Sequence, residues 1–118
     1  MLSREMSEPA NATQEAAAER RRSARIHVRR AICLRWQQDG AAHEEATHTL
    51  CISRYGCGVA CAQQVPPGTA VTLALEHGTH NGTVSYVMKN AAENFFELGI
   101  AFAEDGSAFW GVEFEPVP

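Results

Sequence analysis

The basic residues of this 118-residue chain are concentrated in one short segment. Seven of its ten lysines and arginines lie between positions 20 and 35, with no acid among them: Arg20, Arg21, Arg22, Arg25, Arg29, Arg30 and Arg35. An arginine side chain is a planar fork of N–H donors that matches phosphate oxygens and the O6/N7 edge of guanine. The segment therefore predicts a site for a compact anionic ligand, the alternative being a basic flank that pairs with an acidic body.

The rest of the chain carries the opposite charge. Residues 1–19 hold one arginine and four glutamates, and from position 36 onward ten acids face two basic residues, so the net charge is −4. An acidic body repels a long polyanion such as a nucleic acid. A small ligand can contact the arginine segment alone, so this charge pattern favours a small ligand.

Few residues are arranged for catalysis or metal binding. The four cysteines (Cys33, Cys51, Cys57 and Cys61) form no C-x-x-C pair, so no zinc site is predicted. Ser53 lacks the G-x-S-x-G context of a nucleophile, and the glycine patterns of phosphate-binding and dinucleotide-binding loops are absent. We therefore expect no enzymatic activity, no metal and no cofactor.

The apolar residues predict the elements that must position a ligand site. From residue 25 onward, apolar and polar residues alternate in short stretches separated by turn residues, which is typical of β-strands. The predicted strands are 25–36, 48–53, 57–62, 71–76, 84–88, 96–102 and 110–115. Residues 37–40 and 77–82 are predicted turns. In the second strand, alternation places Leu50 and Ile52 toward the core and Cys51 and Ser53 on the opposite face.

Six or seven short strands predict an all-β domain. A small six-stranded antiparallel barrel is favoured, because an open sheet of this size would expose two long edges. We expect the barrel domain to cover residues 20–118 and to follow a mobile or short-helical N-terminal arm, residues 1–19. The chain has no apolar run of membrane-spanning length and no signal-peptide core, so a cytoplasmic protein without membrane insertion is expected.

Two motifs in the chain resemble those of the PilZ domain. Residues 21–25 (R-R-S-A-R) have the form R-x-x-x-R, and residues 51–56 (C-I-S-R-Y-G) have the spacing of the [D/N]-x-S-x-x-G pattern. The motifs occur in the family's order, each next to an early strand. Residues 96–102 (F-E-L-G-I-A-F) also look like the late barrel strand of that family. The resemblance covers about residues 20–115.

The resemblance implies a bacterial domain that binds cyclic di-GMP, a second messenger with two guanines and two phosphates. Our first hypothesis is that the domain is a receptor that relays this signal to a protein partner. The resemblance also implies that Arg21 and Arg25 grip guanine edges and phosphates. Position 51, Ser53 and Gly56 would close over a guanine from the barrel surface. Arg20 or Arg22 is expected to stack on a base, as a guanidinium plane can.

Position 51 departs from the family pattern, because Cys51 stands where the pattern has Asp or Asn. A carboxylate or amide accepts the N1–H and N2–H groups of guanine, whereas a thiol is a poor acceptor. Losing one such contact costs about 1–3 kcal/mol, equivalent to about ten- to a hundredfold in affinity. The alternative is therefore a degenerate PilZ domain that does not bind cyclic di-GMP and serves as a protein–protein adaptor.

A nucleic-acid-binding barrel is a third interpretation. Such barrels stack bases on exposed aromatic side chains. By alternation, the candidate aromatic residues are expected in the core instead: Phe96, Phe102, Trp110 and Phe114. This interpretation is therefore the weakest of the three, and no nucleic-acid partner is expected.

Overall fold

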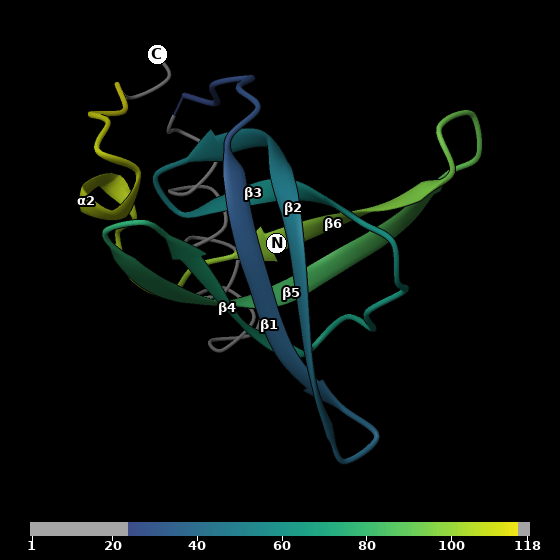
Figure 1. Cartoon of the computed structure of the whole chain (residues 1–118). Coiled ribbons are helices and arrows are strands. Elements are labelled where there is room, and N and C mark those ends of the chain that lie inside the picture. Colours follow the sequence, from purple (N-terminus) through teal and green to yellow (C-terminus); the bar gives the residue numbers. More distant parts are fainter. Residues whose placement is uncertain (1–23, 116–118) are drawn as a thin grey trace, which may run out of the picture.

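The computed structural model describes residues 24–115, and its strands close into one antiparallel barrel (Figure 1). The elements are β1 (Ala31–Gln38), β2 (Ala41–Ser53), β3 (Gly56–Cys61), β4 (Ala70–Leu75), β5 (Gly78–Asn90), β6 (Phe95–Ala101) and the short helix α2 (Ser107–Trp110). Around the barrel the order is β1-β2-β3-β6-β5-β4, and β4 pairs with β1 to close the ring. The predicted all-β class and six-stranded antiparallel barrel are confirmed.

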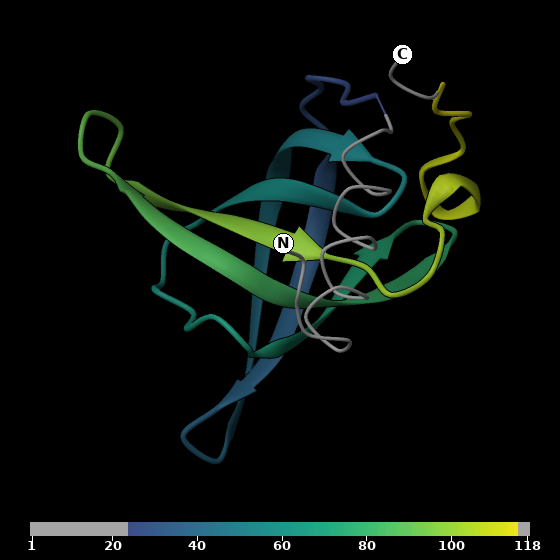
Figure 2. The same cartoon turned by 180° about the vertical axis from the view of Figure 1, so that it is seen from behind.

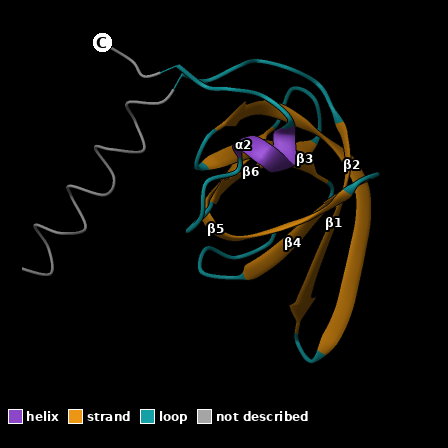
Figure 3. Cartoon of the chain, turned by 90° about the vertical axis from the view of Figure 1, so that its left-hand side faces the viewer, coloured by secondary structure: helices purple, strands orange, loops and turns teal. Residues whose placement is uncertain are grey.

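The core fills the barrel and extends under α2. Inward side chains such as Leu34, Val59, Leu73 and Leu98, each 0% exposed, come from four different strands. In a view into the end of the barrel, α2 lies across the opening (Figure 3). Its buried residues Phe109 and Trp110 belong to the same apolar cluster, so the helix seals that end of the core.

The predicted seventh strand at 110–115 is wrong, because this region contains the end of α2 and an irregular segment. Gly111 ends the helix in the left-handed conformation, with a φ of 70°. The barrel is already closed between β4 and β1, so it offers no free edge to a further strand. Trp110 and Phe114 are nevertheless buried, as the alternation predicted.

The other large differences from the prediction are at the beginnings of three strands, and the second strand begins at Ala41 instead of residue 48. The first strand begins at Ala31, and the residues before it form only an isolated bridge between Ile26 and Ile52. The fifth strand begins at Gly78, so the predicted turn at 77–82 is reduced to Glu76 and His77. Polar residues made this stretch resemble a loop, but an exposed strand face also carries polar residues.

Two β-bulges interrupt the alternation, one in β2 between Thr49 and Cys51 and one in β5 between Val84 and Tyr86. The prediction that Leu50 faces the core is therefore wrong. Thr49 is fully buried instead, and Leu50 does not join the core cluster. A bulge places an extra residue in one strand and re-aims the side chains that follow. Both bulges border the candidate site described below.

Candidate functional site

The hollow that contains the predicted site residues lies on the outer face of the barrel, over β2, β3, β6 and β5. Figure 2 views the barrel from the side of β5 and β6. The hollow has a volume of about 330 Å³. Its lining includes four predicted site residues: Arg25, Cys51, Ser53 and Gly56. Arg20, Arg21 and Arg22, together with the predicted arm at 1–19, lie outside the described residues.

A backbone bridge brings Arg25 to this hollow. The next residue, Ile26, donates its N–H to the carbonyl of Ile52 and accepts the N–H of Ile52 in return, both at 2.9 Å. On the other side of Arg25, the N–H of Ala24 donates to the carbonyl of Glu115 at 2.9 Å. Ile52 separates the two site residues Cys51 and Ser53, so the bridge fixes Arg25 beside both of them.

Ser53 and Gly56 form the two sides of the β2–β3 turn. They are register partners, and the Ser53 hydroxyl donates to the Gly56 carbonyl at 3.3 Å. Gly56 also faces β6 closely, since a Cβ at this position would lie 2.5 Å from the carbonyl oxygen of Ile100. The glycine is therefore required by the packing of β3 on β6, independently of any ligand.

Two further glycines form the floor of the hollow. Gly58 on β3 and Gly99 on β6 are register partners. The ring of Tyr86 lies over Gly99, where a Cβ would collide with it. A Cβ at Gly58 would instead meet only ordinary contacts, the nearest being Cys51 Sγ at 3.4 Å. The Tyr86 ring fills the place of a side chain at Gly99, whereas the place of a side chain at Gly58 is bordered by Cys51 Sγ and Glu97 Oε2.

Tyr86 and Glu97 are joined across this floor. The Tyr86 hydroxyl donates to Glu97 Oε2 at 2.9 Å. Burial, the hydrogen bond to Glu97 and the charge of Glu97 raise the pKa of Tyr86 to about 12. The phenol is therefore protonated, and able to donate, throughout the neutral range.

One basic side chain, Arg25, lines the hollow, and the acidic side chain of Glu97 lies beside it, in contact with the lining residue Tyr86. Arg25 is exposed, and it forms no ion pair with any other residue between positions 24 and 115. The charges of Arg25 and Glu97 act on the Tyr86 phenol in opposite directions, so both lie near it. The arrangement offers a guanidinium to an anion and a carboxylate to N–H donors.

The carbonyl side of the turn is tied to the C-terminal segment. The Trp110 indole N–H donates to the Ser53 carbonyl at 3.1 Å, and Gly106 N–H donates to the Arg54 carbonyl at 2.7 Å. The Arg54 guanidinium donates to the Phe114 carbonyl at 2.7 Å. These contacts attach the turn to the C-terminal segment on the side away from the hollow, so the Ser53 hydroxyl faces the hollow.

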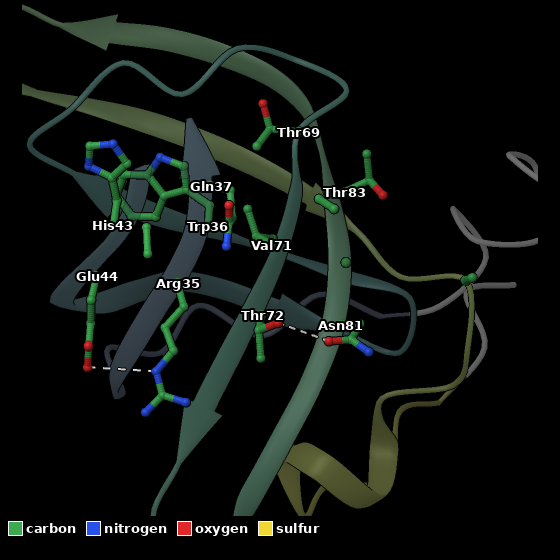
Figure 4. A pocket seen from close by; sticks show the side chains of 14 residues that line it. Arg35, Trp36, Gln37, His43, Glu44, Thr69, Val71, Thr72, Asn81 and Thr83 are labelled. Atoms are coloured by element: carbon green, nitrogen blue, oxygen red, sulfur yellow. Dashed lines mark hydrogen bonds and ion pairs between the residues drawn. The ribbon is translucent and has the colours of Figure 1, made fainter. Parts of the chain in front are cut away.

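A larger hollow of about 920 Å³ lies over β1, β2, β4 and β5 (Figure 4). Its basic side chain, Arg35, is paired with Glu44 at 3.7 Å, and Glu44 Oε2 also accepts the Cys33 thiol at 3.0 Å. The Cys33 hydrogen bond and the Arg35 charge lower the pKa of Glu44. Across the hollow, Thr72 donates to Asn81 at 3.1 Å. None of the predicted site residues lines it, and its charged groups neutralise each other.

Sequence reasoning did not single out Tyr86, Glu97, Gly58 or Gly99. Alternation in 96–102 does place Glu97 and Gly99 on the outward face. The signal that was missing is the bulge at Ser85, which shifts the register of β5 against β6 and sets Tyr86 opposite Gly99.

Between residues 24 and 115, no three His, Cys, Asp or Glu side chains are grouped so as to hold a metal ion. No helix in the same range is long and apolar enough to cross a membrane. Comparisons of the chain with protein-family models, with curated proteins and with solved structures gave no match.

Proposed function

We propose that this chain is a PilZ-like receptor domain that binds cyclic di-GMP and relays the signal to a protein partner. The observation that carries the proposal is the hollow in which Arg25 lies with Cys51, Ser53 and Gly56. These residues belong to two motifs that are far apart in the sequence. Their convergence at one concave surface is what a bipartite ligand site requires.

The chemistry of the hollow suits one end of the ligand. The Arg25 guanidinium can form charge-assisted hydrogen bonds with a phosphate or the O6/N7 edge of a guanine. The missing side chain of Gly58 leaves room beside Cys51 for the edge of a base. A volume of about 330 Å³ accommodates one base and its phosphate. We expect the arginines that precede Arg25, namely Arg20, Arg21 and Arg22, to contact the remainder of the ligand.

The connection to a partner is proposed to run through the segment that contains Arg25. Its backbone is bonded on one side to Ile52 and on the other to Glu115. A ligand that holds Arg25 therefore stabilises both contacts and fixes the preceding arginines against the barrel. Ordering a segment on ligand binding presents a new surface, which a partner protein can recognise.

A protein–protein adaptor that does not bind cyclic di-GMP is the second candidate, and Cys51 favours it. The Cys51 thiol lines the hollow at the position where the motif has an acceptor of guanine N–H groups. If no other residue supplies this acceptor, the domain keeps the fold without the ligand. A gain of binding in Cys51→Asn would identify a degenerate site.

Isothermal titration calorimetry with cyclic di-GMP tests the proposal. We expect micromolar or tighter binding by the wild-type chain and its loss in Arg21→Ala and Arg25→Ala. Arg29→Ala is the matched control, because Arg29 is exposed in the same basic segment but does not line the hollow. Absence of heat with the wild-type chain at high concentration rejects the proposal and favours the adaptor.

A further inference from the structure

The carboxylate of Glu97 lies beside the thiol that replaces the motif's acceptor. A Cβ placed on Gly58 would be 3.4 Å from Cys51 Sγ and 3.6 Å from Glu97 Oε2. Both atoms therefore border the same small space above Gly58. Glu97 reaches it from β6, since the register pairs Gly58 with Gly99, two residues from Glu97 on the same face.

Tyr86 orients this carboxylate. Its hydroxyl donates to Glu97 Oε2 at 2.9 Å. Its ring packs directly on Gly99, which is possible because glycine has no Cβ. The phenol has a pKa of about 12, so it remains a donor at neutral pH. A carboxylate oxygen accepts more than one hydrogen bond, so Glu97 can accept from Tyr86 and from a ligand together.

We infer that Glu97, positioned by Tyr86, supplies the guanine acceptor that Cys51 lacks and thereby determines base specificity. This inference rests on the proposed function. Guanine presents two parallel donors, N1–H and N2–H, which match the two oxygens of a carboxylate. Adenine has an acceptor at N1 and no amino group at C2, so the same carboxylate would face a lone pair. The site thus selects guanine over adenine. Its acceptor is Glu97 on β6, in place of the Asp or Asn that the motif has at position 51 on β2.

The charges allow this arrangement. A carboxylate near a phosphodiester would repel it, but Glu97 is proposed to face the base edge. Arg25 lies close enough to Tyr86 to lower the pKa of the phenol against the effect of Glu97. Arg25 faces the phosphate of the ligand, and Glu97 faces the N1–H and N2–H donors of the guanine. The pair therefore distinguishes the two ends of one nucleotide.

The test compares cyclic di-GMP with its inosine counterpart, which lacks the N2 amino group, in calorimetric titrations. Wild-type protein is expected to bind the guanine ligand about tenfold more tightly, because the inosine ligand loses one charge-assisted hydrogen bond. Glu97→Ala is expected to weaken cyclic di-GMP binding by about ten- to a hundredfold and to remove the preference between the two ligands. Tyr86→Phe should reduce the preference without abolishing it.

Three controls make the result interpretable. Glu93→Ala removes the same charge from an exposed position in the β5–β6 turn and should change neither affinity nor preference. Cys51→Asn in the Glu97→Ala background should restore the guanine preference, since an amide then provides the acceptor. Circular dichroism of each variant checks that the barrel is folded.

The outcomes separate this inference from the proposed function. If the wild-type chain binds neither ligand, both fail. If the wild-type chain binds cyclic di-GMP and Glu97→Ala retains its affinity and its guanine preference, the domain is a receptor and the role of Glu97 is overturned.

Discussion

The backbones of Ile26 and Ile52 exchange two hydrogen bonds of 2.9 Å, one in each direction. This isolated bridge lies outside the regular ladder of β1, yet it joins the arginine motif to the serine-and-glycine motif. Ile52 is 1% exposed, and Ile26 packs on the same core. The position of Arg25 at the hollow therefore depends on two apolar residues, Ile26 directly after the arginine motif and Ile52 within the serine-and-glycine motif.

Amide hydrogen exchange should reveal this bridge in the ligand-free protein. We expect the N–H groups of Ile26 and Ile52 to exchange slowly together, because each is hydrogen-bonded to the other residue. Cyclic di-GMP should slow the exchange of Ile26 further. Exchange of both N–H groups at the rate of an unstructured peptide would mean that the bridge is absent and that Arg25 is not held at the hollow.

Gly58→Ala should fill the floor of the hollow without unfolding the barrel. The new methyl group would lie 3.4 Å from Cys51 Sγ and 3.6 Å from Glu97 Oε2, both ordinary contact distances. We expect cyclic di-GMP affinity to fall about tenfold, because the methyl group displaces the base and removes at least one of its hydrogen bonds. Gly78→Ala is the control, because a Cβ there meets nothing within 4 Å. Equal affinities of the two variants would place the base elsewhere.

Gly56→Ala should instead destabilise the fold. Its Cβ would lie 2.5 Å from the Ile100 carbonyl oxygen, which belongs to the backbone of β6 and cannot rotate away. Forcing an extra methyl into such packing costs about 1–3 kcal/mol. Urea denaturation should show a lower midpoint than for the wild-type chain. An unchanged midpoint would contradict the close approach of β3 and β6.

Much of the fold was predictable from the sequence, because inward and outward residues alternate along each strand. Val71 and Leu73 are buried as the alternation indicates, and the six strands that it marks do form the barrel. The strand predicted at 110–115 was wrong. Its apolar residues Trp110 and Phe114 alternate with polar ones as in a strand, but they cover one end of the core. Alternation of apolar and polar residues indicates which side chains are buried. It does not distinguish a barrel strand from an irregular segment that covers the end of the barrel.

The candidate site was predictable in part. The spacing of Cys51, Ser53 and Gly56 identifies one turn, and the hollow does contain all three with Arg25. Tyr86 and Glu97 were not identified, because their meeting depends on a bulge that no local pattern marks. The pairing of Tyr86, which lines the hollow, with Glu97 beside it is set by the register between β5 and β6, which is a long-range property.

The pH dependence of the Tyr86 phenol should report on Glu97. Its pKa is raised from 10.0 to about 12, so the folded state disfavours ionisation relative to the unfolded state. The corresponding stability is fully present below pH 10 and is lost as the pH rises toward 12. Ultraviolet titration of Glu97→Gln should show ionisation at lower pH, since the carboxylate charge is gone. An unchanged titration would contradict the Tyr86–Glu97 contact.

Arg54→Ala should loosen the C-terminal segment and leave the ligand site largely intact. The Arg54 guanidinium donates to the Phe114 carbonyl at 2.7 Å and faces Asp105 at 3.7 Å, so its removal leaves the segment after α2 without its charged anchor. Hydrogen bonds to charged groups contribute about 1.5–3 kcal/mol, and we expect a loss of that order in urea denaturation.

Trp110 provides a second measurement of the Arg54 variant. Its indole N–H donates to the Ser53 carbonyl, and its ring is 2% exposed, so loosening of the segment should shift its fluorescence to longer wavelength. Arg29→Ala removes an exposed arginine and serves as the control for both measurements. The affinity for cyclic di-GMP should fall less than in Arg25→Ala, because the Arg54 side chain is directed at the C-terminal segment and does not line the hollow. If Arg54→Ala is as stable as Arg29→Ala and its fluorescence is unchanged, the Arg54 side chain does not anchor the segment, which is then held by its remaining hydrogen bonds and the apolar contacts of α2.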